Sequence, residues 1–451
     1  MSASLLLNQH VAVVGLGASG LAAVQLARAS GADVTAFDSK PLAELAAASM
    51  QLASFGAELR AGEADPSFEH FDVVVVSPGV PALPCLARAV AAGVDVCGEV
   101  EFAVRALQAA HPGTPVVAVG GTNGKSTVTS LLGEIFGAHY DHVFVGGNLG
   151  EPLAAVATER WDVVVLEVSS FQMERVRDFA PRASVLLNVT EDHLDRYAGM
   201  AEYAHAKGNA FAKQGPADVA VSLHGDAVCV AEAARGGARQ VTFGSAGDVV
   251  VSREGVQDTR DGTLYAARDI KLQGAHNLAN VAAAVAVARD MGVPASAIRA
   301  VLARFEALPH RTVLVCELAG VRYYDDSKGT NVGASVTALR GLFEPRVVLI
   351  AGGRHKGGSY APLVDAIAEK ARAVITLGEA APLIQAAVGP RAPVLHASTM
   401  REAVHIAHAV AQPGDAVLLS PACSSFDMYA SYKYRGDHFC AEVLELAEGA
   451  K

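Results

Sequence analysis

The sequence predicts an α/β protein with three domains in series, each built around a mainly parallel sheet. Short Val-rich runs alternate with Ala- and Leu-rich amphipathic stretches along the chain, which is the pattern of repeated βαβ units. The chain has 451 residues, of which 51% are hydrophobic, and this is more than one compact core usually holds. We expect the domains to cover residues 1–111, 112–309 and 310–451.

The first domain is predicted to be Rossmann-like. Strands are expected at residues 11–15, 33–38 and 72–79. The first strand enters the stretch GLGASG at residues 15–20, and Asp38 follows the second strand. This is the usual fingerprint of a dinucleotide-binding turn, so an NAD-dependent dehydrogenase is one candidate function. A helix that ends before Pro112 closes the domain.

The second and third domains repeat the alternation of strands and helices. Strands of the second domain are expected at residues 115–121, 162–169, 183–190 and 218–223, followed by a β-rich region at about 241–272 and an alanine-rich helix at 277–292. Strands of the third domain are expected at residues 346–353, 373–378, 393–398 and 415–423. The third domain is therefore also predicted to be Rossmann-like.

Composition narrows the class of protein. The formal net charge of -11 argues against nucleic acid or an anionic membrane as the main partner, because such binders concentrate Lys and Arg. The six cysteines are scattered without CxxC pairs, which is typical of free thiols in a reducing compartment. The first residues lack the features of a signal peptide, and no run stays apolar for about 18 residues. We expect a cytoplasmic monomer without membrane insertion.

The stretch GGTNGKST at residues 120–127 lies between a predicted strand and a predicted helix. A bound phosphate needs inward-turned backbone N–H groups, a helix N-terminus, a lysine and, for Mg²⁺, a hydroxyl. These groups are supplied by Gly121, Gly124, Lys125 and Ser126. The central domain is therefore predicted to be a P-loop-type ATP-binding domain. Its loop is shorter than the common pattern, because Val119 stands where that pattern has its first glycine.

Acidic residues follow two further strands of the same predicted sheet. Glu167 ends one strand, where a carboxylate beside a phosphate loop would bind Mg²⁺. A solvated loop residue is the simpler alternative. The loop after the next strand contains Glu191, Asp192, His193 and Asp195. From the residues alone, His193 is equally compatible with a metal ligand and with an ordinary polar loop residue.

Other polar residues have simple structural explanations when taken singly. Lys207 lies on a short predicted helix and would ordinarily be a solvated surface lysine. Asn277 and Asn280 lie three residues apart at the start of a helix, where N-capping would explain one of them. Arg311 could clamp a transferring phosphoryl group or form a surface ion pair.

Taken together, these motifs resemble the Mur ligase family. They occur in the family's order as GTNGKST, LEVSSFQ, LNVTEDHLDRY, YAHAKGN, GAHNLAN, LPHR, DDSKGTN and LSPACSSFDMY, and they span essentially the whole chain. The resemblance implies an ATP-dependent ligase of peptidoglycan precursor synthesis that joins D-glutamate to UDP-N-acetylmuramoyl-L-alanine. The precursor carboxylate would attack the γ-phosphate of ATP to give an acyl phosphate, from which the amine of D-glutamate displaces phosphate. Two Mg²⁺ ions are implied as cofactors, with ATP as co-substrate.

The resemblance also implies roles for individual residues. The catalytic residues would be Lys125, Glu167, His193, Lys207 and Arg311. ATP would contact Gly121, Thr122, Asn123, Gly124, Lys125, Ser126, Thr127, Asn277, Asn280, Arg311 and Asp326. The metal ions would be held by Ser126, Glu167, His193 and Lys207, the last as a carbamate formed from CO₂ on its ε-amine.

The other two substrates are given their own residues by the same resemblance. The glycine turn of the first domain would bind the UDP pyrophosphate of the precursor instead of NAD. The precursor would contact Gly15, Leu16, Gly17, Ala18, Ser19, Asp38, Ser39, Ser77, Gly79, Asn148 and Gln172. D-Glutamate would contact Lys328, Thr330, Lys356, Ser425, Phe426 and Tyr432.

The chain departs from the family pattern at several positions. Gly120 stands where Thr is common. Arg354 and His355 stand where Asp-Gly is usual, and Tyr432 replaces a common Phe. The last three positions bear on the D-glutamate pocket.

Alternative functions remain at this point. The nearest are a related ligase that adds L-alanine or a diamino acid, or folylpolyglutamate synthase, although DDSKGTN and SPACSSFDMY favour D-glutamate. A non-catalytic nucleotide switch would bind ATP without an amino-acid substrate. A dehydrogenase would leave Lys125 and Lys207 without a role.

Overall fold

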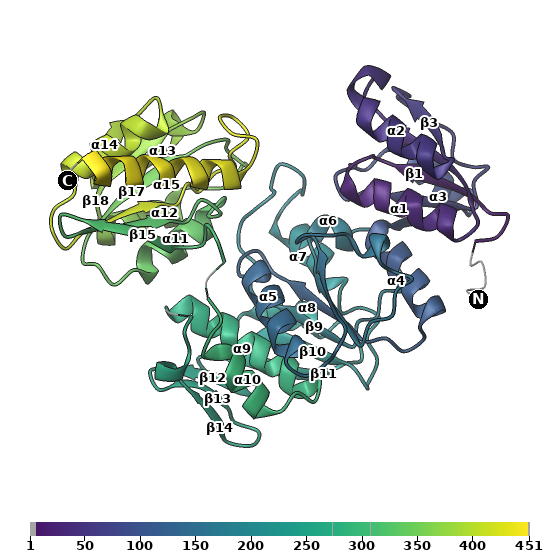
Figure 1. Ribbon diagram of the computed structural model, residues 1–451, viewed down its shortest axis with the longest axis horizontal. Coiled ribbons are helices and arrows are strands. Elements are labelled where there is room, and N and C mark those ends of the chain that lie inside the picture. The colour runs from purple at the N-terminus through teal and green to yellow at the C-terminus, as the bar shows by residue number, and fades with distance from the viewer. Residues whose placement is uncertain (1–5, 273, 307, 450–451) are drawn as a thin grey trace. The chain divides into compact units, whose positions relative to one another are not determined.

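The computed structural model describes residues 6–272, 274–306 and 308–449. Three mainly parallel sheets flanked by helices confirm the predicted α/β class (Figure 1). By their contacts, the residues form two compact units. One holds the chain up to Asn188 with Ala204–Asp269 and Asn280–Ala303, and the other holds Val189–Tyr203, Ile270–Ala279 and the chain from Arg304 onward.

The first sheet is wholly parallel and has the strand order β3-β2-β1-β4-β5. Its strands are β1 (His10–Val14), β2 (Asp33–Asp38), β3 (Glu58–Ala61), β4 (Val73–Val76) and β5 (Asp95–Gly98). Its helices are α1 (Ala18–Ala29), α2 (Ala46–Phe55), α3 (Pro84–Ala91) and α4 (Glu99–Ala110), with a 3₁₀ turn at Leu42–Leu45. The strand order reverses between β1 and β4, and ligands of such sheets bind beside that point.

The glycine turn after β1 requires its glycines. Gly15 has φ +87°, which favours glycine. A Cβ on Gly20 would lie 1.8 Å from the carbonyl oxygen of Gly15, so α1 can approach the turn only because Gly20 has no side chain. Ser77, directly after β4, donates a hydrogen bond of 2.7 Å to the same carbonyl and ties the two strand ends together.

The second sheet has nine strands in the order β14-β13-β12-β11-β10-β9-β6-β8-β7. These are β6 (Val116–Gly120), β7 (Val143–Gly147), β8 (Val163–Glu167), β9 (Ala183–Leu186), β10 (Val219–Leu223), β11 (Arg239–Gly244), β12 (Val249–Ser252), β13 (Gly255–Asp258) and β14 (Thr263–Ala266). Only the β12–β13 and β13–β14 pairs are antiparallel. The accompanying helices are α5 (Lys125–Gly137), α6 (Ser170–Met173), α7 (Met200–Gly208), α8 (Ala227–Ala233), α9 (Ala275–Asp290) and α10 (Ala295–Leu302), with 3₁₀ turns at Leu153–Ala155 and Ala267–Asp269.

The third sheet has the order β15-β16-β20-β17-β18-β19, with only β15 and β16 antiparallel. Its strands are β15 (Val313–Leu318), β16 (Val321–Asp325), β17 (Val347–Gly352), β18 (Ala371–Leu377), β19 (Val394–His396) and β20 (Ala416–Leu419). Its helices are α11 (Val332–Gly341), α12 (Ala361–Lys370), α13 (Ala381–Val388), α14 (Met400–Val410) and α15 (Tyr432–Gly449), with a 3₁₀ turn at Gly389–Arg391.

Both faces of this third sheet are buried. Val347 and Leu349 of β17 pack in one hydrophobic cluster with residues of α11, α12 and α13. Val348 and Ile350 pack in another with residues of α14 and α15. Side chains alternate between the faces of a strand, so a continuous apolar run is what a sheet covered on both sides needs.

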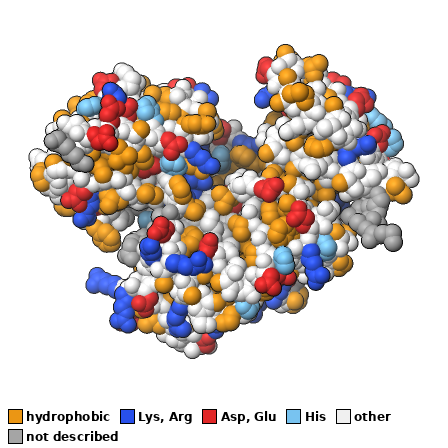
Figure 2. Space-filling model, viewed as in Figure 1, with side chains coloured by type: hydrophobic (Ala, Val, Ile, Leu, Met, Phe, Trp, Pro, Cys, Tyr) orange, Lys and Arg blue, Asp and Glu red, His pale blue; other side chains and the backbone are white. Residues whose placement is uncertain are grey.

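Several general expectations can now be compared with the structure. All six cysteines are free thiols, as predicted. Among the described residues, no helix is both long and apolar enough to cross a membrane. On the face shown in Figure 2, Lys and Arg side chains are interspersed with Asp and Glu side chains.

The first two sheets are joined inside one compact unit by polar contacts of α4. Glu99, at the start of α4, accepts a 3.0 Å hydrogen bond from the backbone N–H of Ala154. Burial raises the pKa of Glu99 to about 7, although this hydrogen bond opposes the shift. Glu101, two residues later, is equally buried but pairs with Arg105 at 2.8 Å. Two neighbouring buried carboxyl groups therefore have opposite electrostatic environments.

We predict that Glu99→Gln stabilises the protein above pH 7. Because the pKa is higher in the folded state, folding binds a proton, and wild-type stability falls as pH rises from about 4.5 to about 7. Glutamine keeps an oxygen acceptor for Ala154 without a charge, so the gain at pH 8 should be about 1–3 kcal/mol. Urea unfolding at pH 5 and pH 8 measures it.

The matched control is Glu101→Gln, which breaks an ion pair and should destabilise the protein at both pH values. If Glu99→Gln lowered the free energy of unfolding at pH 8 as Glu101→Gln does, the assignment of an uncompensated buried charge to Glu99 would be wrong.

Candidate active site

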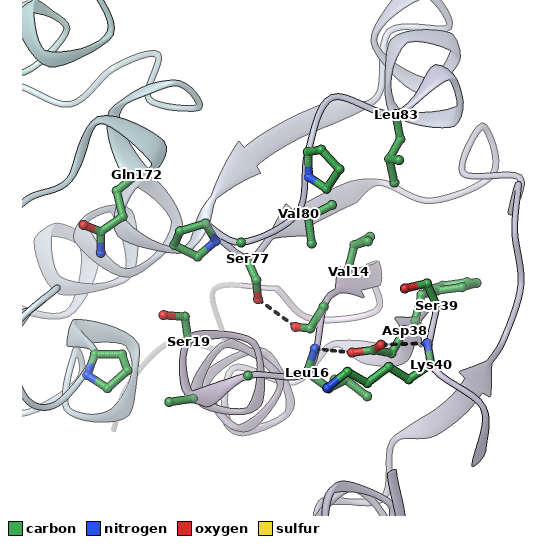
Figure 3. A pocket seen from close by; sticks show the side chains of 18 of the residues that line it. Val14, Leu16, Ser19, Asp38, Ser39, Lys40, Ser77, Val80, Leu83 and Gln172 are labelled. Carbon is green, nitrogen blue, oxygen red and sulfur yellow. Dashed lines mark hydrogen bonds between the residues drawn. The ribbon is translucent and has the colours of Figure 1, made fainter. Parts of the chain in front are cut away.

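A cavity of about 770 Å³ opens beside the point where the first sheet reverses its strand order (Figure 3). All the residues predicted to bind the UDP precursor line it. They are Gly15, Leu16, Gly17, Ala18, Ser19, Asp38, Ser39, Ser77, Gly79, Asn148 and Gln172. The cavity therefore combines the glycine turn with residues far along the chain, Asn148 just after β7 and Gln172 on α6.

The carboxylate of Asp38 stabilises two backbone segments that line this cavity. One oxygen accepts from the backbone N–H of Leu16 at 2.9 Å, and the other accepts from that of Lys40 at 3.0 Å (Figure 3). In NAD enzymes the corresponding acid hydrogen-bonds a ribose hydroxyl, whereas here it holds the turn. Lys40 lines the same cavity, and its ammonium is a charged donor of the kind that anionic ligands need. Sequence reasoning missed Lys40, although it directly follows the predicted contacts Asp38 and Ser39.

Gln172 reaches the cavity from α6. Its side-chain oxygen accepts from the backbone N–H of Ser169 at 2.9 Å, and the Ser169 hydroxyl accepts from the backbone N–H of Gln172 at 3.2 Å. This reciprocal capping box orients the side chain. The amide nitrogen of Gln172 is the donor that a ligand in the cavity could use.

The predicted phosphate loop follows β6 and leads into α5. Gly121 and Gly124 have φ of +140° and +86°, so both positions favour glycine. The Lys125 ammonium donates to the carbonyl of Thr122 at 2.9 Å. The Lys207 ammonium donates to the carbonyl of Gly121, also at 2.9 Å. Lys207 is only 5% exposed, so the reading of it as a solvated surface lysine is wrong.

Asn188, just beyond β9, holds the phosphate loop in place. Its side-chain oxygen accepts from the N–H of Asn123 at 2.8 Å, and its side-chain nitrogen donates to the carbonyl of Asn123 at 3.1 Å. Its own carbonyl accepts from the N–H of Thr122 at 3.0 Å. Sequence reasoning missed this residue, although it stands inside the motif LNVTEDHLDRY.

Asn277 and Asn280, near the start of α9, have different surroundings. A Cβ on Gly124 would lie 2.5 Å from the side-chain oxygen of Asn280, so that amide packs directly on the phosphate loop. Both asparagines lie inside α9, which begins at Ala275, and the expectation that one of them is its N-cap is therefore wrong. Asn277 lines a second cavity, described below.

Glu167 is the last residue of β8. It lies opposite Val119 of β6, the strand that leads into the phosphate loop. It is buried, and one of its carboxylate oxygens accepts a 2.8 Å hydrogen bond from the side chain of Asn148. Gly147 is required there, because a Cβ would lie 2.6 Å from the carbonyl oxygen of Glu167. Asn148 thus contacts both the first cavity and Glu167.

The donors gathered around the phosphate loop fit magnesium in their chemistry. Ser126 offers a hydroxyl and Glu167 a buried carboxylate, and hard oxygen ligands are those that Mg²⁺ prefers. Among the described residues, no three His, Cys, Asp or Glu side chains come together as a metal site of protein ligands alone. Mg²⁺ usually keeps waters and substrate phosphates among its ligands, so a hydroxyl and a carboxylate fit its coordination.

In the second compact unit, the acidic loop after β9 is anchored by the loop after β17. Asp192 pairs with the ammonium of Lys356 at 3.3 Å and accepts a 3.1 Å hydrogen bond from Asn331. Burial alone raises the pKa of Asp192, but the charges of Lys356 and His193 with these hydrogen bonds outweigh it and lower the pKa. The neighbouring His193 has φ +55°, a left-handed conformation. One of its ring nitrogens lies 3.8 Å from Asp192.

A second cavity, of about 350 Å³, lies within this unit. Its lining includes the predicted ATP contacts Asn277 and Arg311. His276 and Phe343 also line it, and Phe343 is 84% exposed, so its ring face is open to a flat ligand. Burial and the charge of Arg311 lower the pKa of His276. Sequence reasoning missed His276 and Phe343.

Asp326 is placed differently from Asn277 and Arg311. It is buried and accepts hydrogen bonds from Ser420 at 2.6 Å and Thr312 at 3.2 Å. Burial raises its pKa to about 7, although the Ser420 bond and Arg311 oppose the shift. It is not among the residues that line the second cavity, so in this structure it supports the turn that carries Arg311.

The residues predicted to bind D-glutamate have separate contact partners in the structure. The Lys328 ammonium donates to the hydroxyl of Tyr432 at 3.2 Å and lies 4.8 Å from the centre of its ring. Lys356 instead pairs with Asp192. Ser425 is buried, whereas Phe426 is 65% exposed.

Comparison with known proteins shows to which family this chain belongs. The Mur ligase MurD-like N-terminal domain matches residues 9–98, the Mur ligase middle domain matches residues 119–288, and the Mur ligase glutamate ligase domain matches residues 310–423. The UDP-N-acetylmuramoylalanine–D-glutamate ligase of Syntrophotalea carbinolica is 43% identical, over 97% of this chain and 98% of that protein. The chain belongs to the Mur ligase family. The ligase of the same name from Myxococcus xanthus is 42% identical, over 96% and 97% of the two chains.

Solved structures of other Mur ligases share the fold. The UDP-N-acetylmuramate–alanine ligase MurC from Thermotoga maritima has a TM-score of 0.60 at 19% identity, over 98% of this chain and all of that one. The MurF ligase from the same organism, solved with ADP, has a TM-score of 0.62 at 17% identity, over 93% and 96% of the two chains. The predicted three-domain α/β Mur ligase fold is confirmed.

We predict that Asn188→Ala weakens ATP binding selectively. The substitution removes both side-chain hydrogen bonds to Asn123 but leaves the backbone bond to Thr122. With two bonds lost from the loop that is predicted to contact phosphate, the KM for ATP should rise roughly tenfold. Steady-state kinetics with each substrate varied in turn measures this. An equal rise in the KM of every substrate would instead indicate general disruption of the sheet.

Proposed function

We propose that this Mur ligase joins D-glutamate to UDP-N-acetylmuramoyl-L-alanine, consuming ATP and releasing ADP and phosphate. The observation that carries the proposal is the position of Asn148, which lines the first cavity and also hydrogen-bonds Glu167 at the phosphate-loop edge of the second sheet. A precursor in that cavity would therefore end beside the γ-phosphate. The relatives that share about 43% identity carry the name of this D-glutamate ligase, which supports the choice of amino acid.

Each domain is proposed to bind mainly one substrate. Residues 1–111 would bind the UDP precursor, with further contacts from Asn148 and Gln172. Residues 112–309 would bind ATP, with further contacts from Arg311 and Phe343, and residues 310–451 would bind D-glutamate. Lys40 and the turn at residues 15–20 would contact the diphosphate of UDP. Asn277, Arg311, His276 and Phe343 would contact ATP in the second cavity.

The phosphate loop would hold the triphosphate of ATP. Lys125 donates to a loop carbonyl, and its ammonium group can transfer this hydrogen bond to a phosphate oxygen. Ser126, Glu167 and His193 are proposed to hold two Mg²⁺ ions, together with Lys207 as a carbamate. Bound Mg²⁺ neutralises charge on the phosphate oxygens.

The reaction would proceed in two steps. The terminal carboxylate of the precursor attacks the γ-phosphorus of ATP, the bond to the β-phosphate oxygen breaks, and an acyl phosphate and ADP result. The neutral amine of D-glutamate then attacks the acyl carbon, loses a proton and expels phosphate from the tetrahedral intermediate. Phosphoryl transfer depends mainly on positioning and charge neutralisation, which Lys125 and Arg311 would supply.

D-Glutamate carries two carboxylates that need charged or hydrogen-bonding partners. Lys328 and Lys356 would pair with them, while Thr330, Ser425, Phe426 and Tyr432 would complete the pocket. Because the reaction consumes ATP, we place the enzyme in the cytoplasm, and we expect it to act as a monomer.

The amino-acid specificity is tested by phosphate release. With ATP, Mg²⁺ and UDP-N-acetylmuramoyl-L-alanine present, D-glutamate should give turnover, whereas L-alanine and meso-diaminopimelate should not. Lys125→Ala is the control, because without its ammonium the release should fall at least a hundredfold. Turnover with meso-diaminopimelate but not D-glutamate would overturn the proposed function.

We predict that Lys207→Ala loses most activity and recovers part of it with added short carboxylates. Such acids would replace the carbamate oxygens, whereas they cannot replace an ammonium group. The measurement is phosphate release against acetate or propionate concentration. Lys207→Arg is the comparison, because it keeps a cation but cannot form the carbamate. Full activity of Lys207→Arg without any carboxylate would refute the carbamate.

A further inference from the structure

The loop between β17 and α12 carries Lys356 and is rich in glycine. Two of its glycines, Gly353 and Gly357, have φ of +130° and +81°. Such a segment has many accessible conformations when unrestrained. The position of Lys356 therefore depends on the side chains that tether this loop.

Backbone hydrogen bonds tie one end of the loop to the segment after β20. Arg354 donates its N–H to the carbonyl of Ser424 at 2.9 Å, and Ser424 donates in return at 3.1 Å. The Arg354 guanidinium also pairs with Glu379 at 3.2 Å, but both side chains are exposed. An exposed pair of this kind contributes little. The backbone pair brings the loop next to the segment that contains Ser425.

A chain of three side chains links the same two segments closer to Lys356. The His355 ring nitrogen Nδ1 lies 2.9 Å from the hydroxyl of Tyr360, and that hydroxyl lies 3.2 Å from the sulfur of Cys423. Tyr360 precedes α12 and is 8% exposed, and Cys423 is also buried, so both belong to the core on one face of the sheet. The Tyr360 hydroxyl is thus a fixed point between the loop of Lys356 and the segment of Ser425.

The hydroxyl and the thiol both retain their protons at neutral pH. Burial raises the pKa of Tyr360 and raises that of Cys423 to about 11. The thiol can therefore donate to the hydroxyl, and the hydroxyl can donate to Nδ1 of a neutral imidazole. Tyr360 and Cys423 are buried, so the bond between them is shielded from water, whereas His355 at the other end of the chain is exposed.

We propose that His355 and Tyr360 are positioning residues that set the distance between Lys356 and Ser425 and so determine the affinity for the amino-acid substrate. Neither residue needs to touch that substrate. The proposal rests on the proposed function, in which Lys356 and Ser425 contact D-glutamate. The plainer alternative is that Tyr360 only fills the core.

The kinetic test uses Tyr360→Phe, which keeps the ring and removes the central hydroxyl. The KM for D-glutamate should rise roughly threefold to tenfold, whereas kcat and the KM values for ATP and the UDP precursor should stay within about twofold. His355→Gln should have the same effect, and the double variant should be no worse than either single variant because both break one chain. His355→Asn, whose side-chain oxygen can take the place of Nδ1, should restore most of the affinity.

The matched control is Tyr323→Phe. Tyr323 is a buried tyrosine of the same unit whose hydroxyl lies 2.7 Å from Nδ1 of His408, so the variant breaks the same kind of bond elsewhere. It should leave the KM for D-glutamate unchanged. An equal rise in both variants would overturn the proposal.

Amide hydrogen exchange gives a readout that does not need turnover. The amides of Arg354 and Ser424 are hydrogen-bonded to each other's carbonyls, and their exchange should speed up in Tyr360→Phe but not in Tyr323→Phe. Unchanged exchange in Tyr360→Phe would overturn the positioning role. If amide exchange responded as expected but the wild-type protein did not use D-glutamate, the proposed substrate would be wrong. The positioning role of His355 and Tyr360 would still hold.

Discussion

The parallel register of β6 with its two neighbours is the constraint on which the phosphate site depends. Val119 of β6 lies opposite Glu167 of β8, and Gly120 lies opposite Leu186 of β9. Parallel strands end at the same edge, so the loop after β6, the carboxylate of Glu167 and the clamp of Asn188 come together there. A slip of one residue would turn the side chain of Glu167 to the opposite face of the sheet and remove it from its place beside Val119.

The central strands could be predicted because their sequences are nearly pure apolar runs. The strands β3, β5 and β7 were missed, since the first two are short and begin with Glu58 and Asp95, and glycines end the third. Each of the three lies at an edge of its sheet, where one side has no partner strand and apolar content is less strongly required. The antiparallel β15–β16 pair was missed for the same reason, because β15 is an edge strand with a mixed burial pattern.

The candidate site also has features that the sequence predicts and features that it does not predict. Glycines with positive φ and a lysine at a helix start are local features, so the phosphate loop could be read from residues 120–127. Lys207 could not, because its partner Gly121 lies 86 positions earlier in the chain. Asn188 and Tyr360 depend likewise on partners 65 and 63 positions away. Only packing reveals that these ordinary residues hold a loop in place.

A protein of net charge -11 that is proposed to bind three anionic substrates needs its cations at defined points. Its overall field repels anions at long range, and salt screens that field beyond about 8–10 Å. Short-range contacts therefore decide binding. Lys356 illustrates the consequence, because Asp192 already neutralises it. An incoming carboxylate gains from this lysine only when it is held at hydrogen-bond distance, so the placement of the loop, more than its charge, controls affinity.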